Sequence, residues 1–312
     1  MKELFIMQKI NQHQKAFKEQ IEQSRKDLGK RPEWLKVKLP TGENYSDVKN
    51  LMRRQKLNTV CEEARCPNIA ECWNHRSATF MILGDTCTRS CGFCNVKLGI
   101  PNELDTNEPY RVVESVIELD LRHVVITSVN RDELKDGGAT IFKECVRLIR
   151  ERKPDCTVEI LIPDFKGDEQ AFEIIMQNPP DILNHNLETV PRLYHAVRPQ
   201  AKYERSLKLI KWFKDKGLKT KSGIMVGIGE KPEEVLDLMR DLVNHGCDIL
   251  TIGQYLQPTK EHLPVDRFVT PDEFAMYKLE GLKMGFKIVE SAPLVRSSYH
   301  ADEHARAIFD EK

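Results

Sequence analysis

The chain has 312 residues, 40% hydrophobic and 31% charged, a balance typical of a folded globular protein. Its 48 Lys and Arg balance 48 Asp and Glu. A general binder of nucleic acid or anionic membranes normally has a basic excess, so we expect neither partner. The apolar run Leu4–Met7 is too short for a signal peptide or membrane span, and five acids in the first 38 residues disfavour a mitochondrial leader. We therefore expect a cytoplasmic protein.

The N-terminal segment is polar and basic. Its first 38 residues carry ten Lys or Arg against five acids, a local excess of +5. Ile10, Phe17, Ile21 and Leu28 are spaced along one weak helix face. The segment is either a solvated helical extension or a basic arm that docks an acidic partner.

From residue 77 onward, strand-like and helix-like patterns alternate in about six βα units. We expect strands at 78–83, 123–129, 157–162, 181–184, 218–226, 248–252 and 286–289. We expect helices at 109–119, 139–152, 171–176, 203–216, 232–245 and 270–285. This alternation predicts an α/β fold with a parallel sheet, either doubly wound or a partial barrel. No G-x-G-x-x-G follows the first strand, so nothing favours a dinucleotide-binding fold.

Three cysteines follow the first predicted strand, where ligands of parallel sheets gather. Cys87, Cys91 and Cys94 have C-x₃-C-x₂-C spacing. A thioredoxin-like dithiol would leave Cys87 unexplained, and a zinc site would need a fourth ligand such as His75. Three thiolates instead favour a [4Fe–4S] cluster with one iron left open.

This loop resembles the signature of radical S-adenosylmethionine enzymes. In that family the three cysteines hold a [4Fe–4S] cluster whose open iron binds S-adenosylmethionine. The resemblance places Phe93 beside the adenine of that cofactor. It also implies a partial (β/α)6 TIM-like barrel over residues 73–290.

A second triad lies upstream of the barrel, at Cys61, Cys66 and Cys72, with C-x₄-C-x₅-C spacing. A polar segment, Arg296-Ser297-Ser298-Tyr299, lies near the C-terminus. Together with the first triad described above (Cys87, Cys91 and Cys94, the radical triad), these motifs resemble the lipoyl synthase family. The resemblance implies an N-terminal auxiliary-cluster segment (1–72) and a C-terminal closing tail (291–312). It also implies that Ser298, rather than Ser297, is the fourth ligand of a second [4Fe–4S] cluster.

Further similar segments extend over residues 31–305, although Asn95 and Asn130 stand where family members often have Asp. From these segments we expect cofactor contacts at Thr127, Ser128, Gly137, Gly138, Asn184, Asn186, Glu188, Arg198 and Lys221. Satisfied loop polar groups, a plain turn at Gly137-Gly138 and surface charges are the alternatives. Arg296 would guide the closing segment. We expect structural roles for His262 and His300, and core packing for Cys145, Cys156 and Cys247.

The resemblance implies radical insertion of two sulfur atoms, at C6 and C8 of a protein-bound octanoyl-lysine. Two S-adenosylmethionine molecules would be consumed, with sulfur drawn from the auxiliary cluster. No side chain can deprotonate an alkyl chain, so a radical route is chemically required. Implied partners are octanoylated lipoyl domains of dehydrogenase E2 subunits or the glycine-cleavage H protein, and a reductant such as ferredoxin or flavodoxin. Two alternatives stay open: a biotin-synthase-like or methylthio-transferring radical enzyme, and a non-enzymatic iron–sulfur carrier.

Overall fold

A computed structural model describes residues 12, 14–23, 28–37 and 42–309. Its main sheet has eight strands in the order β1-β2-β5-β6-β7-β8-β9-β10, within the described residues. Only β1 runs antiparallel to its neighbour. Since β1 and β10 do not pair with each other, the sheet is an open, partial barrel. The strands are β1 (Asn58–Thr59), β2 (Thr79–Ile82), β5 (His123–Ser128), β6 (Thr157–Leu161), β7 (Ile182–Asn184), β8 (Lys219–Val226), β9 (Ile249–Gln254) and β10 (Ile288–Ser291).

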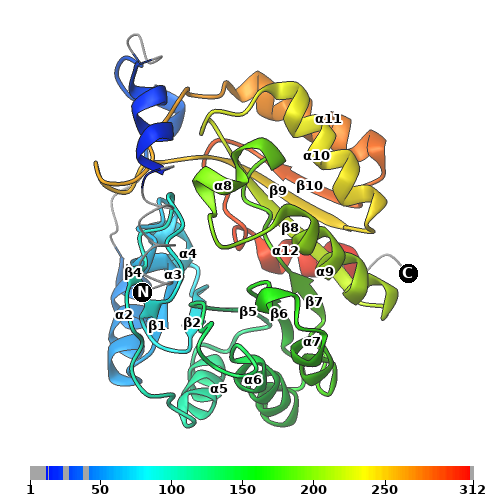
Figure 1. Ribbon diagram of the computed structural model, residues 1–312. Coiled ribbons are helices and arrows are strands. Elements are labelled where there is room, and N and C mark those ends of the chain that lie inside the picture. Colours follow the sequence, from blue (N-terminus) through cyan, green and yellow to red (C-terminus); the bar gives the residue numbers. More distant parts are fainter. Residues whose placement is uncertain (1–11, 13, 24–27, 38–41, 310–312) are drawn as a thin grey trace.

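Six helices cover the outer face of the sheet, one after each parallel strand from β2 to β9 (Figure 1). They are α5 (Glu108–Glu118), α6 (Ala139–Arg152), α7 (Glu169–Met176), α9 (Tyr203–Asp215), α10 (Pro232–Asn244) and α11 (Pro271–Met284). Local signals fix their starts: the Thr270 hydroxyl accepts from the amide of Glu273, and the Asp168 carboxylate accepts from that of Gln170. The predicted partial barrel of six βα units is confirmed.

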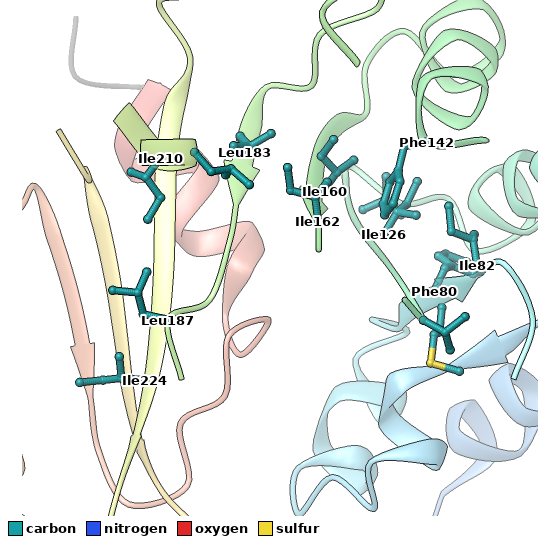
Figure 2. Close-up of a cluster of buried hydrophobic side chains, with 14 of the residues drawn as sticks. Phe80, Ile82, Ile126, Phe142, Ile160, Ile162, Leu183, Leu187, Ile210 and Ile224 are labelled. Atoms are coloured by element: carbon teal, nitrogen blue, oxygen red, sulfur yellow. The ribbon is translucent and has the colours of Figure 1, made fainter. Parts of the chain in front are cut away.

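The main core lies between the strands and these helices (Figure 2). Phe80, Ile126 and Ile160 point outward from three adjacent strands and are fully buried, with Phe142 of α6 packed against them. Burying each such side chain stabilises the fold by roughly 1.5–3 kcal/mol. Because strand side chains alternate, the other set of residues faces the barrel lumen.

The last strand begins two residues later than predicted. Gly285 ends α11 in the left-handed region with φ 115°, and the amide of Phe286 still donates to the carbonyl of Gly281. This six-to-one hydrogen bond belongs to a helix C-terminal motif. Phe286 and Lys287 are therefore not strand residues, and β10 starts at Ile288.

A C-terminal helix that the periodicity did not predict, α12 (Ala301–Phe309), fills the lower lumen. Ala305 and Ile308 pack against Ile182 and Ile249, the first residues of β7 and β9. This end of the barrel is thus closed by the chain's own tail, and any cavity must lie at the other end.

The N-terminal part packs around the open edge of the sheet. Residues 14–23 are helical, followed by η1 (Glu33–Leu35), α2 (Glu43–Arg54), α3 (Val60–Glu63) and α4 (Ile69–Asn74). The rings of Tyr45 in α2 and Trp73 in α4 lie 5.1 Å apart. Phe17 and Ile21 pack inward, as their spacing predicted, whereas Ile10 lies outside the described residues. None of the described helices is long and apolar enough to cross a membrane.

Candidate active site

A cavity of about 1220 Å³ opens at the carboxyl ends of the strands. It exceeds the roughly 300–1,000 Å³ typical of a small-molecule site, so it has room for more than one ligand. Both cysteine triads contribute to its lining, and so does the tail that carries Ser298. Strand residues in the lining include Thr79, Met81, Thr127, Ser128, Leu161, Met225 and Gly253.

The loop with the radical triad leaves β2 through a short parallel bridge between β3 (Thr86–Cys87) and β4 (Lys97–Leu98). The loop after β5 holds Cys87 in place. The amide of Asn130 donates to Cys87 Sγ at 3.4 Å, and its carbonyl accepts from the amide of Thr88 at 3.1 Å. Asn130 thus holds this loop through its backbone, which does not require a carboxylate side chain.

Arg89, inside the triad, fixes the loop electrostatically. Its buried guanidinium binds both Asp132 oxygens, at 2.7 and 2.8 Å, and Asp164 Oδ1 at 2.7 Å. Arg205 completes the group at 3.0 Å from Asp164 Oδ2, and its charge and that of Arg89 hold the pKa of the Asp164 carboxyl well below its usual range. Bidentate Arg–carboxylate pairs of this kind are geometrically specific. Sequence reasoning missed this group, although both Asp residues follow strands at the ligand-binding edge.

The other half of the loop rests on later segments of the chain. The amide of Gly92 donates to the carbonyl of Val197, and its carbonyl accepts from the amide of Leu263. The carbonyl of Cys94 lies 2.9 Å from Nε2 of His262. A Cβ at Gly92 would stand 2.8 Å from Leu263 Cδ1, so a larger residue here would push the Leu263 side chain aside. The predicted structural role of His262 agrees with this contact.

The second triad (Cys61, Cys66 and Cys72, the auxiliary triad) lies on two short helices and the turn between them. Cys61 lies in α3, whose N-cap is Thr59, and Cys72 lies in α4. Cys66 lies between them, and its amide donates to the carbonyl of Cys61 at 3.0 Å. All three cysteines line the cavity, so the triad faces the space that the radical triad faces.

Burial disfavours the charged form of five thiols of the two triads, those of Cys61, Cys66, Cys72, Cys91 and Cys94. Burial is the largest cause and raises the pKa of Cys91 to about 11 and those of Cys94 and Cys61 to about 12. Burial also raises the pKa of Cys72, as does repulsion from Cys61 and Cys66. Thiolates at these positions require a bound cationic centre. Among the described residues, no group of three His, Cys, Asp or Glu side chains is arranged to hold one metal ion. Neither triad is therefore a preformed site for a single metal.

The C-terminal tail joins the auxiliary triad to the barrel. The carboxamide of Asn68 donates to the carbonyl of Leu294 at 2.7 Å, and the Tyr299 hydroxyl donates to Glu71 Oε1 at 3.1 Å. Ser297 and Ser298 consequently line the cavity together with the three cysteines. His300 stacks on Tyr299 with ring centroids 3.9 Å apart.

Most of the predicted cofactor contacts line the cavity, namely Phe93, Thr127, Ser128, Asn186, Glu188 and Arg198. Three of them carry buried polar atoms without a hydrogen-bond partner: Ser128 Oγ, Asn186 Oδ1 and Arg198 Nε. Such orphaned atoms are costly unless a ligand satisfies them. The pocket therefore fits a polar cofactor such as S-adenosylmethionine.

Two carboxylates line the cavity among the described residues, the half-buried Glu188 and the exposed Glu261. Burial raises the pKa of Glu188, while the Arg198 guanidinium and a 3.0 Å hydrogen bond from the Asn186 amide oppose that rise. Its backbone has φ 66°, a costly conformation for a non-glycine residue. A Cβ on nearby Gly223 would stand 2.8 Å from Asn186 Oδ1, so glycine leaves that amide its place.

Four other predicted contacts lie outside the cavity lining. Asn184 and Lys221 are fully buried below it, where Asn184 Nδ2 donates to Glu159 Oε1 at 2.8 Å and Lys221 Nζ lies 3.0 Å from Glu159 Oε2. Gly137 and Gly138 form the turn before α6, with φ of 60° and 93°. Cys145, Cys156 and Cys247 are buried in the core, as predicted.

Sequence and structure comparisons agree with this geometry. The pattern of the radical SAM superfamily matches residues 81–242, and that of the N-terminal domain of lipoyl synthase of the Radical_SAM family matches residues 3–66. Among solved structures, SuiB of Streptococcus suis bound to S-adenosylmethionine aligns with a TM-score of 0.55 at 14% identity, over 73% of this chain and 54% of its own. Methylornithine synthase aligns with a TM-score of 0.50 at 15% identity, over 82% and 84%. At this identity the likeness is one of fold. Barrel, cysteine loop and superfamily match define a radical S-adenosylmethionine enzyme.

Comparison with curated relatives identifies the family within this class of enzymes. A lipoyl synthase of Rubrobacter xylanophilus is 62% identical over 275 residues, covering 88% of this chain and 86% of the relative. A lipoyl synthase of Koribacter versatilis is 55% identical over 279 residues, covering 89% and 92%. The chain belongs to the lipoyl synthase family. Its activity is that of a radical S-adenosylmethionine sulfurtransferase with iron–sulfur clusters as cofactors, which acts on lipoyl-carrier proteins.

Proposed function

We propose that the two triads divide the lipoyl synthase reaction between them. Cys87, Cys91 and Cys94 hold the cluster that serves S-adenosylmethionine, and Cys61, Cys66 and Cys72 hold the cluster that serves as sulfur source. When bound, these groups supply the electron, the hydrogen-abstracting radical and the sulfur atoms. The observation that carries this assignment is that both triads line one cavity, because a carbon radical must meet its sulfur donor without crossing solvent.

The polar groups around the radical triad orient S-adenosylmethionine. The Glu188 carboxylate and the Asn186 carboxamide oxygen would accept hydrogen bonds from the amino group of the methionine part, and Arg198 would balance its carboxylate. The hydroxyls of Thr127 and Ser128 bind the ribose, and Phe93 packs beside the adenine. Asn184, Lys221, Gly137 and Gly138 act indirectly, because they support the lumen floor and the loop after β5.

Ser298 completes the auxiliary site from the tail. An alkoxide oxygen is a harder ligand than a thiolate and is matched less well to iron. Ser298 would therefore hold its iron less firmly than the three cysteines hold theirs, which suits a group that gives up sulfur. The three cysteines keep the remainder of the group in place during that step.

The division of the chain follows this assignment. Residues 1–72 build the auxiliary site, residues 73–290 form the radical barrel, and residues 291–312 close it, with the first boundary inside α4 (Ile69–Asn74). The finer partners are an E2 lipoyl domain or a glycine-cleavage H protein as carrier, and ferredoxin or flavodoxin as reductant. We place the protein in the cytoplasm.

The test is an anaerobic assay of the reconstituted protein with S-adenosylmethionine, a reductant and an octanoyl-lysine peptide. We expect about eight iron and eight sulfide per chain, for two [4Fe–4S] clusters. We also expect 5′-deoxyadenosine and a peptide whose mass shows a dithiolane. Formation of 5′-deoxyadenosine without any sulfur-containing peptide, with both clusters intact, would reject the assignment.

A further inference from the structure

The rim of the cavity carries cations that nothing in the described part of the chain neutralises. Lys15 and Lys18 on the helix of residues 14–23, Arg31 before η1 and Arg65 after α3 all line the cavity, and all but the half-buried Lys18 are exposed. None of the four forms an ion pair with a carboxylate of the described residues. Lys18 Nζ donates only to the carbonyl of Lys260, and Arg65 only to that of Pro258.

The four rim cations differ in this respect from basic residues elsewhere on the surface and from those deeper in the cavity. Arg and Lys residues elsewhere on the surface commonly pair with carboxylates, as Arg54 does with Glu118 and Arg192 with Glu234. Inside the cavity, Arg89 is neutralised by two Asp residues. In the part of the chain that the structure describes, the cavity lining contains two carboxylates, Glu188 and Glu261. A positive potential therefore remains at the mouth, where low-dielectric walls focus it outward.

Apolar side chains are exposed on the same rim. Val37 and Leu98 both line the cavity and remain 43% and 48% exposed. Ile100, two residues beyond Leu98, is 95% exposed. Exposed apolar groups surrounded by charges mark contact surfaces for other proteins.

A protein-borne substrate explains both features. The octanoyl chain and its lysine stem can enter the cavity, whereas the folded carrier domain must stay outside at the mouth. We propose that this rim, comprising Lys15, Lys18, Arg31, Arg65, Val37 and Leu98, docks an acidic face of the carrier domain around its modified lysine. The inference rests on the proposed function and adds the surface through which that function selects its protein partner.

The helix of residues 14–23 contributes to this surface because it is fixed at the mouth. Its Gln14 carboxamide donates to the carbonyl of Ser90, inside the radical-triad loop, at 2.9 Å. Ile21 is buried, and a Cβ on Gly229 would approach Phe17 within 3.3 Å. Figure 1 shows this dark-blue helix beside the loop between β9 and α11. This helix therefore holds Lys15 and Lys18, two of the four rim cations, at the mouth of the cavity.

The test compares two charge-reversal variants of the full-length holoenzyme. The rim variant carries Lys15→Glu, Lys18→Glu and Arg31→Glu. The matched control carries Arg53→Glu, Arg122→Glu and Lys208→Glu, which lie away from the cavity lining. A second rim variant, Lys15→Glu with Arg31→Glu, spares the hydrogen bond of Lys18. Each protein is titrated with an octanoylated lipoyl domain at low and at high salt, and assayed with an uncharged octanoyl-lysine peptide.

We expect both rim variants to weaken binding of the carrier domain by about tenfold or more at low salt, and to reduce its salt dependence. The control variant and the peptide kinetics should stay unchanged. Carrier binding that is equally tight in rim and control variants would overturn the docking surface. An equal loss toward carrier and peptide would also overturn it, because the cations would then act inside the site. Failure of the unaltered protein to convert the peptide would instead reject the proposed function.

Discussion

Ser298 and its neighbour Ser297 offer a comparison at the scale of a single residue. Both line the cavity beside the auxiliary triad, and the backbone holds Ser298 in a turn where its carbonyl accepts from the amide of Ala301. The two residues have the same side chain in adjacent positions. Only the ligand role that we assign to Ser298 separates them.

Replacing Ser298 with Cys should retain the auxiliary cluster, because a thiolate binds iron more firmly than an alkoxide. Dithiolane formation should fall at least about tenfold, a cost of roughly 1.4 kcal/mol in the barrier, because iron is then released less easily. Iron content and product mass measure the two effects. Ser297→Cys is the matched control and should leave turnover unchanged; a normal rate for Ser298→Cys would contradict the ligand role.

The sequence could predict candidate metal-binding residues because cysteine spacing carries its own chemistry, and the structure brings both triads to one cavity. It could not decide between residues at the ends of strands. Asn184 and Asn186 look equivalent in sequence, yet Asn184 points to Glu159 below the cavity and Asn186 lines it. Lys221 was expected to contact the cofactor, but its ammonium group pairs with Glu159 of this chain. How deep a side chain lies in the barrel depends on the register between neighbouring strands. The residue pattern of one strand alone does not contain that register.

At the scale of elements, the close contact between the tail and β9 is the feature most sensitive to change. The amide of Gln254 donates to the carbonyl of Pro293 at 3.1 Å, and that of Ala292 donates to Ile252 at 3.2 Å. A Cβ on Gly253 would lie 2.0 Å from the carbonyl oxygen of Val295. That neighbour is backbone and cannot rotate away, so a side chain here must displace the segment leading to Ser298.

Gly253→Ala should therefore loosen the auxiliary site. Overpacking of this kind costs about 1–3 kcal/mol. We expect loss of iron from the auxiliary site and a fall in dithiolane formation, while 5′-deoxyadenosine is still produced. Gly99→Ala is the control, because its Cβ would meet only the Thr86 side-chain methyl at 3.3 Å. Full iron content and full sulfur insertion in Gly253→Ala would show that the tail does not depend on this contact.

Elements with strong periodicity were predictable, and α6 matches its predicted bounds of 139–152. Helix α2 (Glu43–Arg54), the short helices α3 and α4 and the tail helix α12 were not predicted. Helices of four and six residues are too short for a periodic signal. Helix α12 is stabilised by tertiary packing in the lumen, through Ala305 and Ile308, which local sequence does not reveal.

At the scale of the whole molecule, the fold brings three distant parts of the chain to one cavity. The auxiliary triad precedes the barrel, the radical triad follows β2, and the tail returns from the last strand to contact the auxiliary segment. Asn68 bonds to Leu294, 226 residues away, and Arg65 to Pro258, 193 residues away. The topology thus places both triads on one cavity, with α12 below it and the helix of residues 14–23 at its mouth.

The most direct test of this division is to remove each triad in turn and to measure both products. With Cys61→Ala, Cys66→Ala and Cys72→Ala, we expect 5′-deoxyadenosine to form from S-adenosylmethionine while the octanoyl-lysine peptide gains no sulfur. With Cys87→Ala, Cys91→Ala and Cys94→Ala, we expect neither product. A sulfur-containing peptide from the first variant would contradict the central claim that the upstream triad holds the sulfur source.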